Sequence, residues 1–170
     1  METINEIKKK LIDGSLMEGE TIQFKTKLLQ GNEDLLARIL VALSNSSGGY
    51  LIIGVTELTK GCIIVGISES ENEIRSYLNN AISKYTIGLK YVLSFENVEN
   101  KHIAIVRIEH SDSIVYYSRR ETSPERQISY VLSGGKIVAA DKMLYKRVFK
   151  LDKTEQVPPL ETVKSVQFWS

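Results

Sequence analysis

A helix that runs directly into a glycine pair and a buried strand is the feature that most constrains this chain. Apolar residues in 36–43 recur at helical spacing, and the pattern stops at the Ser-Ser-Gly-Gly corner of residues 46–49. The next run, 50–55, is apolar, rich in isoleucine and too short for a helix, which predicts a buried strand. Two glycines permit a sharp exit from the helix and the close approach of another group. We therefore expect a ligand-binding corner here.

Composition and charge are those of one ordinary globular domain. The chain has 170 residues, of which 42% are hydrophobic and 25% are charged, and its formal net charge is +1. The net charge of the whole chain therefore does not indicate any particular class of binding partner. Residues 111–150, in contrast, carry eight Lys or Arg residues against four acidic ones. Such a basic segment on a neutral protein suits an anionic polymer. The alternative is a solvated surface, which composition alone favours.

Several classes of site are excluded by residue type and spacing. Cys62 is the only cysteine, so there is no disulfide framework and no cysteine-based metal site. His102 and His110 lack metal-ligand spacing, and residues 134–136 do not form a Walker loop. No signal-peptide pattern and no apolar run of roughly 20 residues is present. We expect a cytoplasmic protein that needs no cofactor and contacts no membrane.

Hydrophobic periodicity and capping residues predict an α+β domain with a mixed, mostly antiparallel sheet and packed helices. The expected helices begin at the caps Thr3, Asn32 and Ser70, with a last one over roughly 140–149. The expected strands cover 21–25, 50–55, 62–67, 90–96, 102–109, 114–118 and 128–133. A turn over 56–61 would join the second strand to the third. The domain is expected to span 1–150, followed by a C-terminal tail over 151–170.

Acidic residues flank the first predicted strand and follow the second. Strand alternation would place Glu18, Glu20 and Ile22 on one face, with Gln23 on the other. Glu57 comes shortly after the second strand. Carboxylates that converge from two strand ends could hold a divalent cation, which could activate water or stabilise a phosphoryl transition state. The alternative, which spacing alone favours, is that these acids are surface and turn residues.

Four motifs occur in order between about residues 15 and 150. They are 18–25 (Glu-x-x-x-x-Gln-Phe-Lys), 42–55 (with Asn45, Gly48, Gly49, Gly54 and Val55), 65–67 (Val-Gly-Ile) and 130–140 (Tyr-Val-Leu-Ser-Gly through Ala). Together they resemble the Schlafen AlbA-type domain, which is also assigned as the DNA-binding domain of many bacterial regulators. The resemblance implies nucleic-acid binding. In some Schlafen proteins it implies a metal-dependent ribonuclease with three active-site acids.

The resemblance maps a degraded catalytic triad onto this chain. The three acid positions fall at Glu18, at Gln23 and just after the Gly-Val, nearest Glu57 or Thr56. Gln23 is an amide, and its neutral oxygen binds a hard cation more weakly than a carboxylate does. Glu18 and Glu57 would hold Mg²⁺ or Mn²⁺ only in a nuclease. A late family arginine is replaced by Leu132, and Lys136 or the Arg119–Arg120 pair could supply that phosphate contact.

The nucleic-acid contacts expected from these considerations are Lys25, Asn45, Gly48, Gly49, Arg119, Arg120, Arg126 and Lys136. The Asn45 side chain could instead hydrogen-bond backbone groups at the end of its own helix, and Lys25 could simply be exposed at a strand end. Tyr116 and Tyr117 are possible stacking surfaces, although ordinary sheet packing is the favoured role.

These expectations predict a protein that binds DNA or RNA without efficient nuclease activity. Two alternatives remain, namely a metal-dependent endoribonuclease for structured RNA such as tRNA, and a protein-interaction or dimerisation module. We also expect a two-fold homodimer, which would place two copies of residues 111–150 around a shared groove. The apolar tail end, Phe168–Trp169, could pack on the partner or on its own lobe.

Overall fold

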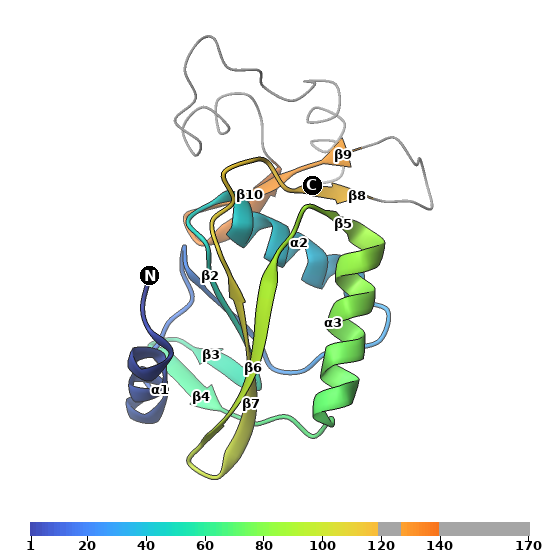
Figure 1. Cartoon of the computed structure of the whole chain (residues 1–170). Coiled ribbons are helices and arrows are strands. Elements are labelled where there is room, and N and C mark those ends of the chain that lie inside the picture. Colours follow the sequence, from blue (N-terminus) through green and yellow to red (C-terminus); the bar gives the residue numbers. More distant parts are fainter. Residues whose placement is uncertain (119–126, 140–170) are drawn as a thin grey trace.

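A four-stranded mixed sheet forms the centre of the protein (Figure 1). The computed structural model describes residues 1–118 and 127–139. The strand order is β1 (Ile22–Lys25), β2 (Gly49–Ile53), β7 (Lys101–Ile108) and β6 (Tyr91–Val98). β1 is parallel to β2, and the other two pairs are antiparallel. The predicted α+β class with a mostly antiparallel sheet is confirmed.

Each face of the sheet is covered by a different set of elements (Figure 1). α2 (Glu33–Asn45) and α3 (Glu71–Tyr85) pack with Leu51 and Val106 into one core cluster. α1 (Ile4–Asp13) and the hairpin of β3 (Val55–Leu58) and β4 (Gly61–Ile64) pack with Ile52 and Ile105 into another. Successive side chains of a strand point to opposite faces, so β2 and β7 contribute to both clusters and are buried on both sides.

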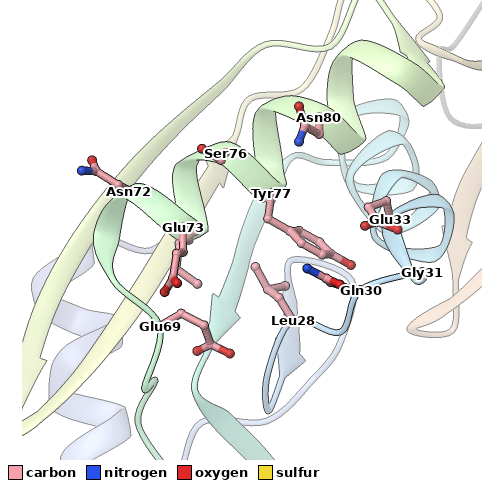
Figure 2. Close-up of a pocket in the computed structure, with 11 residues that line it drawn as sticks. Leu28, Gln30, Gly31, Glu33, Glu69, Asn72, Glu73, Ser76, Tyr77 and Asn80 are labelled. Atoms are coloured by element: carbon pink, nitrogen blue, oxygen red, sulfur yellow. The ribbon is translucent and has the colours of Figure 1, made fainter.

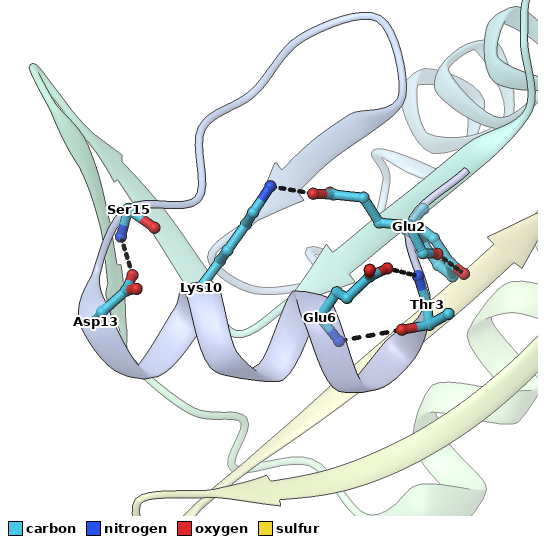
Figure 3. A network of polar contacts seen from close by, with 7 residues as sticks. Glu2, Thr3, Glu6, Lys10, Asp13 and Ser15 are labelled. Atoms are coloured by element: carbon cyan, nitrogen blue, oxygen red, sulfur yellow. Dashed lines mark hydrogen bonds and ion pairs between the residues drawn. The ribbon is translucent and has the colours of Figure 1, made fainter.

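Capping boxes start two of the three described helices, as the sequence predicts. The Thr3 hydroxyl accepts the Glu6 amide at 3.2 Å, and the Glu6 carboxylate accepts the Thr3 amide at 2.6 Å (Figure 3). Lys10, one turn further along, pairs with Glu2. Ser70 and Glu73 form the same box at the start of α3. Asn32 precedes α2 without a side-chain capping bond.

The apolar run 50–55 is not one strand, and the predicted turn over 56–61 is wrong. Gly54 has φ +100° and donates its amide to the Lys25 carbonyl at 2.7 Å. This conformation is accessible to glycine, and it ends β2 at Ile53 and turns the chain away from the sheet. Val55 then begins the separate β3–β4 hairpin, which lies beside the end of β1.

A tight turn joins β6 to β7 in the central sheet, and the remaining described strands form two small sheets. β6 and β7 are joined by Glu99 and Asn100, whose φ values of 51° and 62° fit a two-residue hairpin turn. β5 (Thr86–Ile87), β8 (Tyr116–Ser118) and β9 (Gln127–Ile128) form a three-stranded sheet, and β10 (Tyr130–Ser133) pairs with β11 (Lys136–Ala139). The predicted strand over 128–133 is therefore divided between β9 and β10.

Three predictions lie outside the described residues. They concern the basic side chains of Arg119, Arg120 and Arg126, the helix over 140–149, and the tail over 151–170. Among the described helices, none combines the length and apolar character that crossing a membrane requires.

Candidate functional site

Glu18 and Glu57 lie side by side near the end of β1. Glu18 is half-buried, and its Oε1 accepts the Phe24 amide at 2.7 Å. Burial raises the pKa of Glu18 above its usual range, and the neighbouring Glu57 carboxyl raises it further. The Phe24 amide and the Lys25 ammonium oppose this shift of the pKa. The structure thus brings together two of the three predicted acid positions, with a lysine next to them.

A turn before β1 and the path of β3 produce this pairing. The Gly19 amide donates to the Ile22 carbonyl at 2.9 Å, so the chain bends before the strand begins. The Thr26 and Thr56 hydroxyls are 2.7 Å apart, which holds β3 against the end of β1. The predicted common face for Glu18 and Glu20 is wrong because of the bend. Glu20 instead accepts the Gly135 amide at 2.8 Å, at the β10–β11 turn.

Gln23 is buried and engaged within the fold. Its side chain is 8% exposed, and Nε2 donates to the carbonyls of Gly19 at 3.1 Å and Gly135 at 3.3 Å. In the β1–β2 register Gln23 lies opposite Leu51, a member of the core cluster under α2 and α3. The amide therefore ties β1 to the β10–β11 turn.

The acid pair offers an incomplete set of ligands for a metal ion. No group of three or more His, Cys, Asp or Glu residues able to hold one occurs in the part of the chain that the structure describes. Glu18 and Glu57 together would fit a divalent cation whose other ligands are water or phosphate oxygens, the arrangement that Mg²⁺ commonly adopts. Such an ion would supply charge stabilisation and an activated water.

Asn45 lies inside the protein, where it connects α2 to two later segments. Its side chain is 0% exposed. Nδ2 donates to the Val115 carbonyl and the Ser129 hydroxyl, both at 2.8 Å, and to the Tyr130 carbonyl at 3.1 Å. Oδ1 accepts the Val115 amide at 2.8 Å. Its donors and acceptor are engaged and no surface is left for a nucleic acid, so the predicted contact at Asn45 is not supported.

Gly48 and Gly49 allow the close approach of the protein's own backbone. A Cβ on Gly48 would lie 2.7 Å from the backbone nitrogen of His110, and one on Gly49 would lie 2.1 Å from the backbone carbonyl oxygen of Thr21. Both glycines are buried. The groups that approach the corner are therefore backbone atoms of Thr21, just before β1, and of the residues at the end of β7. The expectation of a ligand-binding corner fails for this steric reason.

The remaining predicted contacts differ in their surroundings. Lys25 is partly exposed beside Glu18, and Lys136 is exposed at the start of β11. Tyr117 is fully buried, with its ring stacked 5.8 Å from Tyr85, so it packs within the core as the favoured alternative expected. Tyr116 is partly buried, and burial raises the pKa of its hydroxyl.

Two pockets that sequence reasoning missed flank the segment around Glu69. One, of about 760 Å³, lies between α3 and the loop after β1 (Figure 2). Tyr77, which lines this pocket, donates to the Leu29 carbonyl at 2.6 Å. The other, of about 570 Å³, lies at the end of β1 and includes Lys27 and Lys101. Their residues come from separate loops without any regular spacing, so the sequence contained no signal for either pocket.

The fold and the acid pair define an α+β domain of the kind that the sequence motifs resemble. Residues 18–141 match the family described as Schlafen, AlbA_2, and the chain belongs to that family. No curated protein matches the sequence.

Several solved structures share the fold, and two of them differ in how much of the matched chain is covered. The DIP2311 protein from Corynebacterium diphtheriae is 14% identical with a TM-score of 0.58, over 85% of this chain and 30% of that one. This chain thus spans less than a third of that protein. The N-terminal domain of an ATP-dependent DNA helicase RecG-related protein from Nitrosomonas europaea is 17% identical with a TM-score of 0.51, over 92% of this chain and 99% of that one.

Proposed function

We propose that this protein binds nucleic acid, DNA or RNA, without cleaving it efficiently. Two observations carry the proposal, one for binding and one against efficient cleavage. The chain belongs to the Schlafen AlbA_2 family, while its middle acid position is a buried glutamine bonded to two backbone carbonyls. The family supports binding, and the glutamine argues against a three-acid metal site. The structural neighbour, a domain of an ATP-dependent DNA helicase RecG-related protein, agrees with a role on nucleic acid.

The proposed contacts are cationic residues on the surface. Lys25 and Lys136 are available in the described residues, and Arg119, Arg120 and Arg126 are proposed from the sequence. Lysine and arginine contacts to phosphates fix the position of a nucleic acid without reading its bases. We therefore expect binding that depends strongly on salt and weakly on sequence.

The test is fluorescence anisotropy with labelled tRNA, single-stranded RNA and duplex DNA over a range of salt concentrations. The variant Lys25→Ala, Lys136→Ala should bind each ligand more weakly and with a flatter dependence of log K on log salt. Lys9→Ala, an exposed lysine on α1, is the matched control. Absence of binding to all three ligands at low salt would refute the proposed function.

A second candidate function, metal-dependent RNA cleavage, is favoured by the Glu18–Glu57 pair. Two adjacent carboxylates repel each other when both are ionised, and either a shared proton or a divalent cation relieves that repulsion. The test is incubation of the native chain with tRNA and Mn²⁺ or Mg²⁺, beside the isosteric variants Glu18→Gln and Glu57→Gln. We expect little cleavage by the native chain. Robust cleavage that both variants lose would make the protein an enzyme.

We also propose that the protein acts in the cytoplasm as a homodimer. Two copies of the basic segment 111–150 would then line one groove, which increases the local charge that a nucleic acid meets. Light scattering should give twice the chain mass of 19.2 kDa. A monomer mass at concentrations well above the dissociation constant for nucleic acid would reject the dimer.

A further inference from the structure

An open pocket of about 570 Å³ lies where β1 ends and is lined by three separate segments. The loop after β1 contributes Thr26 and Lys27, the segment between β4 and α3 contributes Gly66 and Ser68, and the start of β7 contributes Lys101 and His102. We propose that this pocket binds a backbone phosphate of the nucleic acid. The proposal rests on the proposed function and assigns one of its phosphate subsites.

The charges around the pocket favour an anion. Two lysines line it against one glutamate, Glu69, so its net charge is positive even with His102 neutral. Lys27 is exposed and makes no hydrogen bond or ion pair with a described residue. The Lys101 ammonium donates to the Ile64 carbonyl at 2.9 Å, which uses one of its three donors. The remaining donors of both ammonium groups are available to phosphate oxygens.

The walls of the pocket are held in place by internal hydrogen bonds. The amides of Val65 and Gly66 both donate to the Gly54 carbonyl, at 2.8 and 2.9 Å. The Ile67 amide donates to the His102 carbonyl at 2.9 Å, which joins this wall to β7.

The side chain of His102 is held as well. Its Nδ1 lies 3.0 Å from Asn97 Oδ1, and its ring stacks on Phe95 with 5.6 Å between centroids. The backbone wall and His102 are therefore in place before a ligand binds, and Lys27 is the side chain that binding would order.

The position of the pocket connects it to the acid pair. Thr26 lines the pocket, and its hydroxyl contacts that of Thr56, the residue before Glu57. Lys25, which is close enough to lower the pKa of Glu18, directly precedes Thr26 in the chain. The end of β1 therefore carries residues of the pocket as well as Lys25, a neighbour of the acid pair.

The larger pocket on the other side of Glu69 shows why charge decides this assignment. It has about 760 Å³ and is lined by Glu33, Glu69 and Glu73, with no lysine or arginine among its lining residues (Figure 2). A phosphate would be repelled there. Size alone would select that pocket for a nucleotide, whereas electrostatics selects the smaller one.

The first experiment measures the affinity of the full chain for a labelled single-stranded RNA across salt concentrations. Lys27→Ala should weaken binding about fivefold and reduce the slope of log K against log salt by about 0.7. Glu69→Gln should tighten binding, since it removes the opposing charge. Lys9→Ala is the control and should change neither value. If the native chain binds RNA and Lys27→Ala leaves affinity and slope unchanged, the pocket assignment is overturned while the proposed function stands.

The second experiment probes the pocket with inorganic phosphate alone. Titration into the ¹⁵N-labelled full chain should shift the amide resonances of Gly66, Ile67 and Ser68, and Lys27→Ala should suppress these shifts. Absence of such shifts in the native chain overturns the phosphate site, whatever the RNA result. Shifts in a chain that binds no RNA or DNA would refute the proposed function and overturn a nucleic-acid backbone as the source of the phosphate.

Discussion

The corner formed by Asn45, Gly48 and Gly49 and the rim formed by Glu18 and Glu57 differ in what their residues contact. At the corner every side-chain donor and acceptor of Asn45 is bonded internally, and the glycines touch neighbouring backbone. At the rim two carboxylates lie together near the surface, which raises the pKa of Glu18. The strongest sequence pattern in this chain thus reflects packing, whereas the weaker one marks the surface that a ligand can reach.

The largest expected effect is the loss of stability in Gly49→Ala. The new Cβ would lie 2.1 Å from the Thr21 oxygen at a φ of +146°, so β1 and β2 could not keep their spacing. We expect a cost of about 4 kcal/mol and a Tm lower by about 10 °C or more in thermal unfolding followed by circular dichroism.

Gly31→Ala is the matched control for this prediction. Gly31 also has a positive φ, +90°, but a Cβ there would meet nothing within 4 Å. Its cost should be limited to backbone strain of about 1 kcal/mol. Equal losses of Tm in the two variants would show that the corner is not a close-packed junction.

Asn45→Ala should have the next largest effect on stability. It leaves the Val115 amide buried without its acceptor and removes the donor to the Val115 and Tyr130 carbonyls. We expect about 3 kcal/mol of destabilisation in urea unfolding, against less than about 0.5 kcal/mol for Asn80→Ala on the exposed side of α3. A stable Asn45→Ala protein that binds nucleic acid more weakly would instead restore Asn45 to the binding surface.

Gln23→Glu tests whether residue 23, the second of the three acid positions of the family, belongs to the packed corner or to the rim. A carboxylate there would face the carbonyl oxygens of Gly19 and Gly135, which repel it. We expect a loss of about 2 kcal/mol at pH 7.

The loss in Gln23→Glu should shrink at acid pH. Burial raises the pKa of such a carboxyl above the value of about 4.3 that it has in the unfolded chain. The stability contributed by the protonated carboxyl is therefore fully present below the unfolded pKa, and it is lost as pH rises through the folded pKa. Urea unfolding at pH 4 and pH 7 measures the difference. Metal-dependent cleavage by this variant without loss of stability would place residue 23 at the rim.

The three described helices and the family were predictable from the sequence because their signals are local. The capping boxes at Thr3 and Ser70 lie within one helical turn, and the glycine corner is contiguous. The roles of Asn45 and Gln23 were not predictable, because their partners are 70 and 112 residues away in the chain. The break at Gly54 was missed because an apolar run does not show where the backbone turns.

The pairing of Glu18 with Glu57 was only one of two alternatives at the sequence level, because it too depends on residues that are distant in the chain. Their proximity depends on β3 leaving the sheet at Gly54 and passing the end of β1 through the contact of Thr26 with Thr56. No spacing rule encodes that path. The pocket that includes Lys27 and Lys101 depends on the same path and on the β6–β7 turn.

The smallest expected effect is that of Glu57→Gln on the pH dependence of stability. Burial and the neighbouring Glu57 carboxyl raise the pKa of Glu18 in the folded protein. The stability that protonated Glu18 contributes is therefore fully present below the unfolded pKa, and it is lost as pH rises through the folded pKa. Removing the Glu57 charge removes part of that loss.

The native chain and Glu57→Gln should therefore match at low pH, and the variant should be more stable at pH 7 by less than about 1 kcal/mol, because both groups are partly solvated. Urea midpoints at pH 3.5 and pH 7, with Glu71→Gln on the exposed first turn of α3 as the control, measure the difference. A Glu57→Gln protein that is less stable than the native chain at pH 7 would mean that the Glu57 carboxylate makes a favourable contact at the rim. The rim would then resemble the corner in one respect, because its carboxylates would stabilise the fold.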